Sequence, residues 1–243
     1  MIENKVVVVT GAAGGIGRAT AVGLAERGAK LVLGGRTTKS LDEVVDAIRS
    51  AGGQAVAVET DVTSRDDVHA LVATAEAEFG RLDVLVNNAG IGPISALDEL
   101  KTDEWDRMVD VNLKGVLHGI SAALPVFRRQ GEGQFVTVGS VAGMAPTPAM
   151  AVYGATKTAV RVLCEGLRLE AGPDLRVTLV CPGFVATDFV ARVSDPKVRG
   201  ALEEQRDAMA ITPDAIARAI MFAIDQPADV DVNEIVVRPT AQS

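Results

Sequence analysis

The fold of this 243-residue chain is decided near its start by the stretch Val6-Val7-Val8-Val9-Thr10-Gly11-Ala12-Ala13-Gly14-Gly15-Ile16-Gly17. Four consecutive valines are typical of a strand that is buried on both faces of a parallel sheet. The glycines that follow permit a tight turn, and a helical pattern begins at Gly15. The first turn of a helix carries unpaired N–H groups and the positive end of the helix dipole. The stretch therefore predicts a loop that holds the pyrophosphate of a dinucleotide, the alternative being a merely structural glycine turn.

The same alternation of short apolar runs with longer amphipathic stretches continues along the whole chain. Valine-rich runs predict strands at 6–10, 30–34, 54–59, 84–87, 134–138, 177–181 and 234–237. Helical periodicity predicts helices at 15–28, 39–51, 65–80, 103–130, 151–171 and 213–225. Such βαβ alternation predicts an α/β fold, a Rossmann-type doubly wound parallel sheet of about seven strands flanked by helices, with right-handed crossovers.

No linker, repeat or low-complexity tract divides the sequence, so we expect residues 1–243 to form a single dinucleotide-binding and catalytic domain. The least regular segment, 183–211, follows the end of a predicted strand. Because ligands of such sheets bind at the carboxyl ends of the strands, this segment is predicted to be a flap over the binding crevice. The alternative is a plain surface excursion with one helix.

Composition excludes several classes of function. The chain is 48% apolar and 23% charged, which is typical of globular proteins. A net charge of −8 argues against nucleic acid or an anionic membrane as a partner. Cys164 and Cys181 lack metal or redox spacing and are interpreted as structural thiols, and His69 and His118 belong to no metal-ligand pattern, so no metal is expected. No signal peptide or apolar run of about 20 residues is visible, which predicts a cytoplasmic protein outside the membrane.

Tyr153 and Lys157 are four residues apart in a predicted helix, with Ser140 thirteen residues upstream. Residues with this spacing share a helix face, so the ammonium of Lys157 is expected beside the phenol of Tyr153. A phenol titrates near about 10, and a nearby cation lowers that pKa toward a useful range for proton transfer. Tyr153 is the only tyrosine in the chain. The trio predicts the acid/base half of a hydride-transfer site.

The residues after the second predicted strand bear on the choice of nicotinamide cofactor. Enzymes that bind NAD usually place a carboxylate there for the ribose 2′-hydroxyl, whereas this chain has Gly35 followed by Arg36. A guanidinium can hold a 2′-phosphate with two hydrogen bonds. NADP(H) is therefore predicted in preference to NAD(H). The alternative is that Arg36 and Lys39 only begin a solvated helix. Arg18 is a further possible phosphate contact, which solvation of the helix surface explains equally well.

Two further strand ends contribute candidate contacts. Asp61 and Val62 follow the third strand, where a side chain could meet the adenine amino group. Asp61 could equally be the N-terminal cap of the next helix. Asn87-Asn88-Ala89-Gly90 follows the fourth strand, where small residues would let a cofactor pass close to the backbone.

In order and spacing, these motifs resemble the single-domain branch of the short-chain dehydrogenase/reductase family. The motifs are Thr10-Gly11-x-x-x-Gly15-x-Gly17, Asn87-Asn88-Ala89-Gly90, Asn112, Ser140, Tyr153-x-x-x-Lys157 and Pro182-Gly183. The resemblance covers essentially the whole chain. It implies an NADP-dependent oxidoreductase that is a homo-oligomer, either a tetramer or a dimer.

The resemblance also implies a role for each catalytic residue. Tyr153 would be the general acid in reduction and the base in oxidation, and Ser140 would hydrogen-bond the substrate oxygen. Lys157 would lower the pKa of the phenol and bind the ribose hydroxyls, and Asn112 would hold a water that links Lys157 to solvent. Thr187 would orient the nicotinamide carboxamide.

The cofactor-binding residues that the resemblance implies are Gly11, Gly15, Ile16, Gly17, Arg36, Thr37, Asp61, Val62, Asn88, Ala89, Gly90, Val111, Tyr153, Lys157, Pro182, Gly183, Val185 and Thr187. One position departs from the family's NADP-linked pattern, which often has a basic residue just before the Gly-x-Gly pair. This chain has Gly14 there, so selectivity would rest mainly on Arg36.

The sequence says less about the substrate. The segments 141–150 and 91–94 are apolar, which favours a neutral, small ketone or aldehyde over a sugar phosphate. Arg192 and Arg199 could instead bind an acidic substrate, and the C-terminal run 232–240 resembles members that act on 3-hydroxy acids such as serine. Trp105 is expected to pack rather than bind substrate. A non-catalytic NADP(H) sensor is the competing function, although such a protein would not need Ser140, Tyr153 and Lys157.

Overall fold

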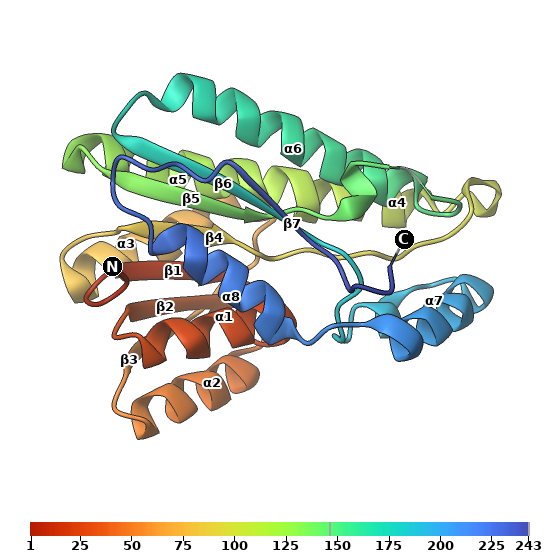
Figure 1. The fold of residues 1–243 in the computed structure, drawn as a ribbon, viewed down its shortest axis with the longest axis horizontal. Coiled ribbons are helices and arrows are strands. Elements are labelled where there is room, and N and C mark those ends of the chain that lie inside the picture. Colours follow the sequence, from red (N-terminus) through yellow and green to blue (C-terminus); the bar gives the residue numbers. More distant parts are fainter. Residues whose placement is uncertain (146, 243) are drawn as a thin grey trace.

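The computed structural model describes residues 1–145 and 147–242. Its centre is a seven-stranded parallel sheet with the strand order β3-β2-β1-β4-β5-β6-β7 (Figure 1). The strands are β1 (Val6–Thr10), β2 (Lys30–Gly35), β3 (Gln54–Glu59), β4 (Val84–Asn87), β5 (Gly133–Val138), β6 (Leu175–Pro182) and β7 (Glu234–Val237). The order reverses between β1 and β4, so the predicted doubly wound sheet is confirmed, and its switch point lies beside the glycine loop that follows β1.

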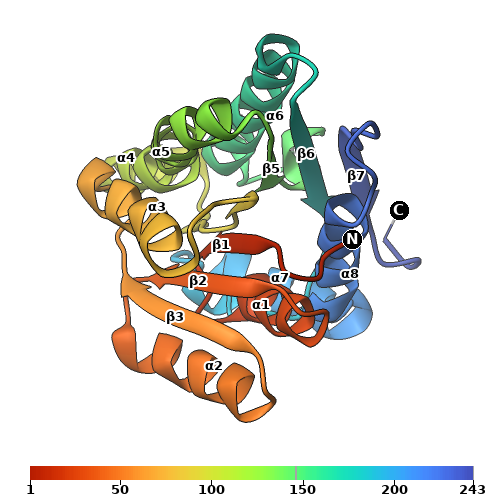
Figure 2. The same cartoon turned by 90° about the vertical axis from the view of Figure 1, so that its left-hand side faces the viewer.

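Helices cover both faces of the sheet, as Figure 2 shows from the amino ends of the strands. One face carries α1 (Gly15–Glu26), α2 (Thr38–Ser50) and α8 (Pro213–Ile224). The other carries α3 (Arg65–Phe79), α5 (Gly115–Gln130) and α6 (Ala151–Ala171), with α4 (Thr102–Val109) packed beside α6. α7 (Pro196–Met209) lies beyond the carboxyl ends of the strands, at the right of Figure 1.

The valine run of β1 supplies both cores of the molecule. Val6 and Val8 pack in the core under α3, α5 and α6, whereas Val7 and Val9 pack in the core under α1, α2 and α8. All four side chains are 0–1% exposed. This two-sided burial is the physical reason for a continuous apolar run in place of an alternating one.

Two predicted elements need correction. The expected continuous α-helix at 103–130 is wrong, because a π-helical turn, Asp110–Lys114, separates α4 from α5. Such turns insert one extra residue per turn and recur at functional sites, and this one contains Asn112. The irregular segment 183–211 contains the 14-residue helix α7; a helix was expected there only in the alternative of a surface excursion, and its bounds were not predicted. Its mixed charge hid the periodicity, because only Leu202 of this helix is buried.

None of the helices in the described part of the chain is long and apolar enough to cross a membrane.

Candidate active site

A cavity of about 1280 Å³ opens at the carboxyl ends of the strands. The residues that line it come from the loops after β1, β2, β3, β4, β5 and β6, and from α4, α6 and α7. Nearly all of the predicted site residues are among them: Gly11, Gly15, Ile16, Arg36, Thr37, Asp61, Val62, Asn88, Ala89, Gly90, Val111, Ser140, Tyr153, Lys157, Pro182, Gly183, Val185 and Thr187. Gly17 and Asn112 do not line the cavity and lie behind its wall.

The glycine loop is held by contacts that only glycine permits. Gly11 and Gly15 have φ angles of +65° and +52°, in the left-handed region. A Cβ atom on Gly17 would lie 2.3 Å from the carbonyl oxygen of Gly11, so that α1 starts in direct contact with the turn. Asn88, directly after β4, holds the loop in place, because its Nδ2 donates to the carbonyls of Thr10 (2.9 Å) and Gly11 (3.1 Å).

The loop fits the pyrophosphate of a dinucleotide. A Cβ atom on Gly14 would meet nothing within 4 Å, so the backbone there is bare on the cavity side. α1 begins at the next residue and has no side chain that caps its first N–H groups. Such free N–H groups at a helix start bind phosphate. The residues present therefore suit an anionic cofactor.

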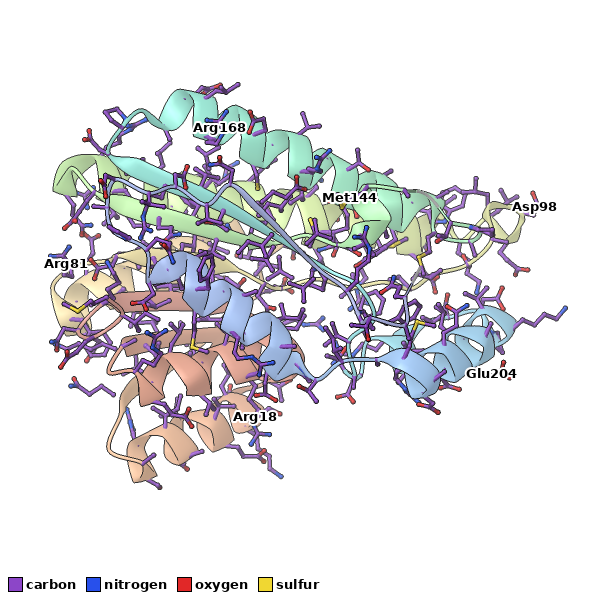
Figure 3. The ribbon with its side chains drawn as sticks, in the orientation of Figure 1. Arg18, Arg81, Asp98, Met144, Arg168 and Glu204 are labelled. Carbon is purple, nitrogen blue, oxygen red and sulfur yellow. The ribbon has the colours of Figure 1, made fainter. Side chains whose placement is uncertain are left out.

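The end of β2 forms the adjoining wall. Gly35, Arg36 and Thr37 line the cavity, and the exposed side chain of Arg36 forms no hydrogen bond or ion pair within the described residues. Thr38, by contrast, donates to Glu59 Oε2 (3.2 Å) and is turned away from the cavity lining. Arg18 lies on α1 and is likewise not a lining residue (Figure 3).

Asp61 lines the cavity and is not the cap of the next helix. Its Oδ1 accepts hydrogen bonds from the backbone N (2.9 Å) and the hydroxyl (2.8 Å) of Thr63. The N-terminal cap of α3 is Ser64, whose hydroxyl accepts from Asp67 N (3.3 Å). The alternative that Asp61 caps the next helix is therefore wrong. Asp61 lies at the cavity wall, and its hydrogen bonds to Thr63 use only Oδ1.

The candidate catalytic residues Ser140, Tyr153 and Lys157 meet where β5, the loop after it and α6 come together. Ser140 begins the loop after β5, and its Oγ accepts from the backbone N of Ala142 (3.1 Å), which fixes the hydroxyl. Lys157 is 6% exposed and donates from Nζ to the carbonyl of Val138 (3.0 Å). Its Nζ lies 5.9 Å from the centre of the Tyr153 ring. α6 thus places both side chains at the cavity wall from one helix face, as the spacing predicted.

The prediction that the Tyr153 pKa is lowered is wrong, because the residues of the structure raise it. Burial raises the pKa of its phenol to about 12, although the neighbouring Ser140 side chain partly offsets this. Burial also lowers the pKa of Lys157 to about 8. The ammonium of Lys157 is bonded to the backbone carbonyl of Val138, and desolvation of the buried phenol is the main cause that sets the pKa of Tyr153.

This shift can be measured directly because Tyr153 is the only tyrosine. The ultraviolet absorbance of the phenolate is expected to appear with a midpoint of about 12 in the folded protein, against about 10 in urea. Between these values the unfolded phenol ionises while the folded one does not. The free energy of unfolding should therefore fall as the pH rises from about 10 to about 12, by roughly 2–3 kcal/mol from this group. A folded midpoint at or below that of the unfolded chain would contradict the burial argument.

Asn112 acts on the backbone rather than on the cavity. Its Oδ1 accepts from Ile91 N (2.8 Å), and its Nδ2 donates to Ile91 O (2.9 Å) and to the Thr156 hydroxyl (3.2 Å). The Thr156 hydroxyl in turn donates to the carbonyl of Tyr153 (2.7 Å). The π-helical turn thus joins the loop after β4 to the catalytic helix.

The loops after β4 and β5 line the cavity mainly with apolar side chains, and the flap adds charged residues. The predicted residues Val141, Ala142, Ala145, Thr147, Pro148, Ala149, Met150, Ile91 and Arg192 line it. Gly92, Pro93, Ile94, Gly143, Met144 and Arg199 do not, and Pro146 lies outside the described residues. Trp105 packs against the apolar cluster around Tyr153, as expected.

The lining residues that the sequence did not single out include Phe184, Phe189 and Gln242. The ring of Phe189 lies 5.4 Å from that of Tyr153. No motif marks these positions, because they depend on how the flap and the C-terminal end fold back. The only signal was their place after Pro182-Gly183 or near the end of the chain.

The family model for short chain dehydrogenases matches residues 5–197 of this chain. The chain belongs to the short-chain dehydrogenase/reductase family. An oxidoreductase of Staphylococcus saprophyticus is 47% identical over 100% of this chain and 98% of its own length. The predicted family is thus confirmed, and this short-chain dehydrogenase/reductase is an oxidoreductase.

Solved structures of the family bind both nicotinamide cofactors. The closed form of a serine dehydrogenase complexed with NADP+ matches with a TM-score of 0.90 and 30% identity, over 98% of this chain and 96% of that one. A family member from Burkholderia phymatum in complex with NAD matches with a TM-score of 0.89 and 31% identity, over 97% and 89%.

Proposed function

We propose that this short-chain dehydrogenase/reductase transfers hydride reversibly between NADP(H) and a small ketone or aldehyde, with Tyr153 as the general acid and base. One observation carries the proposal. Ser140, Tyr153 and Lys157 line the same cavity as the bare glycine loop and Arg36. A protein that only senses a nucleotide has no use for a buried phenol, a fixed hydroxyl and a buried lysine beside it.

In the proposed reaction, Tyr153 handles the proton and Ser140 the charge on the substrate oxygen. The raised pKa of Tyr153 keeps the phenol protonated at neutral pH, which is the form that donates to a carbonyl oxygen during reduction. Ser140 would stabilise the charge that develops on the same oxygen. Lys157 would bind the ribose hydroxyls of the nucleotide. When bound, the nicotinamide supplies or accepts the hydride.

Asn112 is proposed to serve the resupply of protons. A Cβ atom on Gly90 would lie 3.4 Å from Asn112 Oδ1 and 3.5 Å from Lys157 Nζ, so these two groups approach each other across Gly90. A water held there would connect Lys157 to solvent, as the resemblance to the family implies.

Preference for NADP(H) is supported by the wall after β2. Gly35 offers no carboxylate to repel a 2′-phosphate, and Arg36 lines the cavity with a guanidinium that is not engaged by any other described residue. Thr37 lies next to it on the same wall.

Replacing Arg36 with alanine is expected to weaken NADPH binding by roughly 1.5–3 kcal/mol, because a charge-assisted hydrogen bond to the phosphate is lost. NADH binding should hardly change. Fluorescence titration with both nucleotides measures this, and Arg18→Ala is the matched control because Arg18 is an exposed arginine that does not line the cavity. Equal affinity of the wild type for the two nucleotides would refute the preference.

A 3-hydroxy acid is the second candidate substrate. Arg107 on α4 and Arg192 before α7 both line the cavity, and either could bind a carboxylate. The resemblance to a serine dehydrogenase supports the same class.

NADPH oxidation across ketones and aldehydes, and NADP+ reduction with 3-hydroxy acids, tests the function. Turnover of neutral carbonyls supports the first proposal, and turnover of hydroxy acids alone supports the second. Tight NADPH binding without any turnover would establish the sensor.

Assembly into a dimer or tetramer and residence in the cytoplasm are part of the proposal. Val162 and Leu169 lie seven residues apart on α6 and are 68% and 69% exposed. These apolar side chains would be covered in a subunit interface. Light scattering of the purified protein tests the assembly.

A further inference from the structure

Phe189 lies in the segment between β6 and α7 and covers the catalytic phenol. The centres of the Phe189 and Tyr153 rings are 5.4 Å apart and the ring planes are inclined by 58°, a favourable arrangement for an aromatic pair. Phe189 packs in the apolar cluster that also contains Ile94, Met108 and Val190. Tyr153 is only 9% exposed in consequence. A substrate carbonyl must reach the phenol past or beside this ring.

Gly92, in the loop after β4, is the seat of the ring. A Cβ atom on Gly92 would lie 2.1 Å from Phe189 Cζ and 2.7 Å from Cε2. The tip of the ring therefore rests on the bare backbone of Gly92, and no residue with a side chain could occupy this position without displacing it. The φ angle of Gly92 is not in the left-handed region, so the contact with Phe189 is what requires glycine.

The backbone that carries the ring is tied to the nucleotide loop. The N–H of Phe189 donates to the hydroxyl of Thr187 (3.3 Å). A Cβ atom on Gly15 would lie 3.1 Å from the Thr187 methyl carbon, so Thr187 packs directly on the glycine loop. The position of the Phe189 ring is thus set from three sides, by Gly92, by Tyr153 and by the segment that packs on Gly15. α7 continues from this segment, with Leu202 buried in the same cluster and Glu204 on its outer side (Figure 3).

We propose that the contact between Phe189 and Gly92 sets the size limit of the substrate, so that carbonyl compounds with short substituents are preferred over bulky aryl ketones. This inference rests on the proposed function and narrows its substrate class. A rigid apolar wall discriminates between substituents by about 10–200-fold. The ring also closes the site against water while the carbonyl is held at Tyr153.

Phe189→Ala tests the wall itself. The ratio of kcat/KM for an aryl ketone to kcat/KM for a short aliphatic ketone is expected to rise by about 10-fold or more, because the removed ring leaves room beside the phenol. The matched control is Phe222→Ala, since Phe222 lies on α8, is 56% exposed and does not line the cavity. The control should leave the ratio unchanged.

Gly92→Ala tests the seat while keeping the ring. The added methyl group is expected to lift Phe189 from its position and to raise the same ratio. In the Phe189→Ala background the methyl group meets no ring, so Gly92→Ala should add nothing further. Such non-additivity is the signature of a direct contact. Equal effects of Gly92→Ala in both backgrounds would overturn the seat.

Chemical nitration of Tyr153 gives a reading that needs no substrate. Because the chain has one tyrosine, the absorbance of the nitrotyrosine that forms with tetranitromethane reports on this phenol alone. We expect faster nitration in Phe189→Ala and Gly92→Ala than in the wild type and in Phe222→Ala. If the wild type reduces no carbonyl compound, the proposed function and the size limit fail with it, while the nitration rates still decide whether the Phe189 ring on Gly92 covers the phenol. Carbonyl turnover with neither the size ratio nor the nitration rate altered by Phe189→Ala would overturn the inference.

Discussion

Tyr153→Phe is expected to lower kcat for carbonyl reduction by about 10²–10⁴-fold while the affinity for NADPH stays unchanged. The substitution removes one oxygen and keeps the ring. The ring should remain packed against Phe189, because that contact, at 5.4 Å between ring centres, does not involve the hydroxyl. What is lost is the proton that must reach the carbonyl oxygen as hydride arrives.

Stopped-flow measurement of NADPH oxidation, together with a fluorescence titration of NADPH, separates the two effects. A thermal melt serves as the control for the fold. The Tm should change little, because the substitution keeps the ring and removes only the hydroxyl, whose polar neighbour is Ser140. The ultraviolet signal of phenolate formation should disappear in this variant, because no tyrosine remains. Retained turnover in Tyr153→Phe would assign proton donation to another group.

Gly17→Ala is expected to damage both the fold and the nucleotide site. The added Cβ would lie 2.3 Å from Gly11 O and 2.9 Å from Gly11 C, which are backbone atoms, and 2.6 Å from Asn88 Nδ2. Backbone cannot move aside as a flexible side chain can, so we expect a loss of about 1–3 kcal/mol in the free energy of unfolding. In a protein of this size that corresponds to a decrease in Tm of roughly 2–12 °C.

The nucleotide site should fail with it, because Gly11 and Asn88 hold the turn that approaches the cofactor. Misplacement by about 1 Å is enough to lower kcat/KM by about 100-fold. Gly14→Ala is the matched control for the fold, as a Cβ there meets nothing within 4 Å and its φ of −165° suits any residue. A Gly17→Ala protein with the Tm of the wild type would show that the helix start can retreat from the loop.

The parts of the fold that could be predicted from sequence are those governed by local pattern. The run Val6–Val9 is apolar at every position because both of its faces are buried, and this identified a central parallel strand. The break at Asp110–Lys114 could not be predicted, because a single π-helical turn is too short to show a periodicity, and its Asn112 bonds to Ile91 in the separate loop after β4. The bounds of helix α7 could not be predicted, because one buried residue, Leu202, is too weak an amphipathic signal.

The candidate site divides in the same way. The spacing of Tyr153 and Lys157 placed both on one helix face, and both line the cavity. Their protonation could not be read from spacing, because the pKa of Tyr153 depends on desolvation by residues that are distant in sequence. Asp61 illustrates a choice that pattern left open, which the hydrogen bonds of Thr63 and the capping by Ser64 resolved.

By itself, the sequence determined the strand–turn–helix at the start, the succession of strands and helices along the chain and the family, and it singled out Tyr153 and Lys157 as candidate acid/base residues. These depend on residue type and short spacing, which are local properties of the chain. Only the tertiary structure decided that Phe189 lies beside the phenol on Gly92, that Asn112 binds backbone behind the cavity, and that burial raises the pKa of Tyr153. Such facts arise from contacts between residues about 10 to 100 positions apart, and only the packed chain defines them.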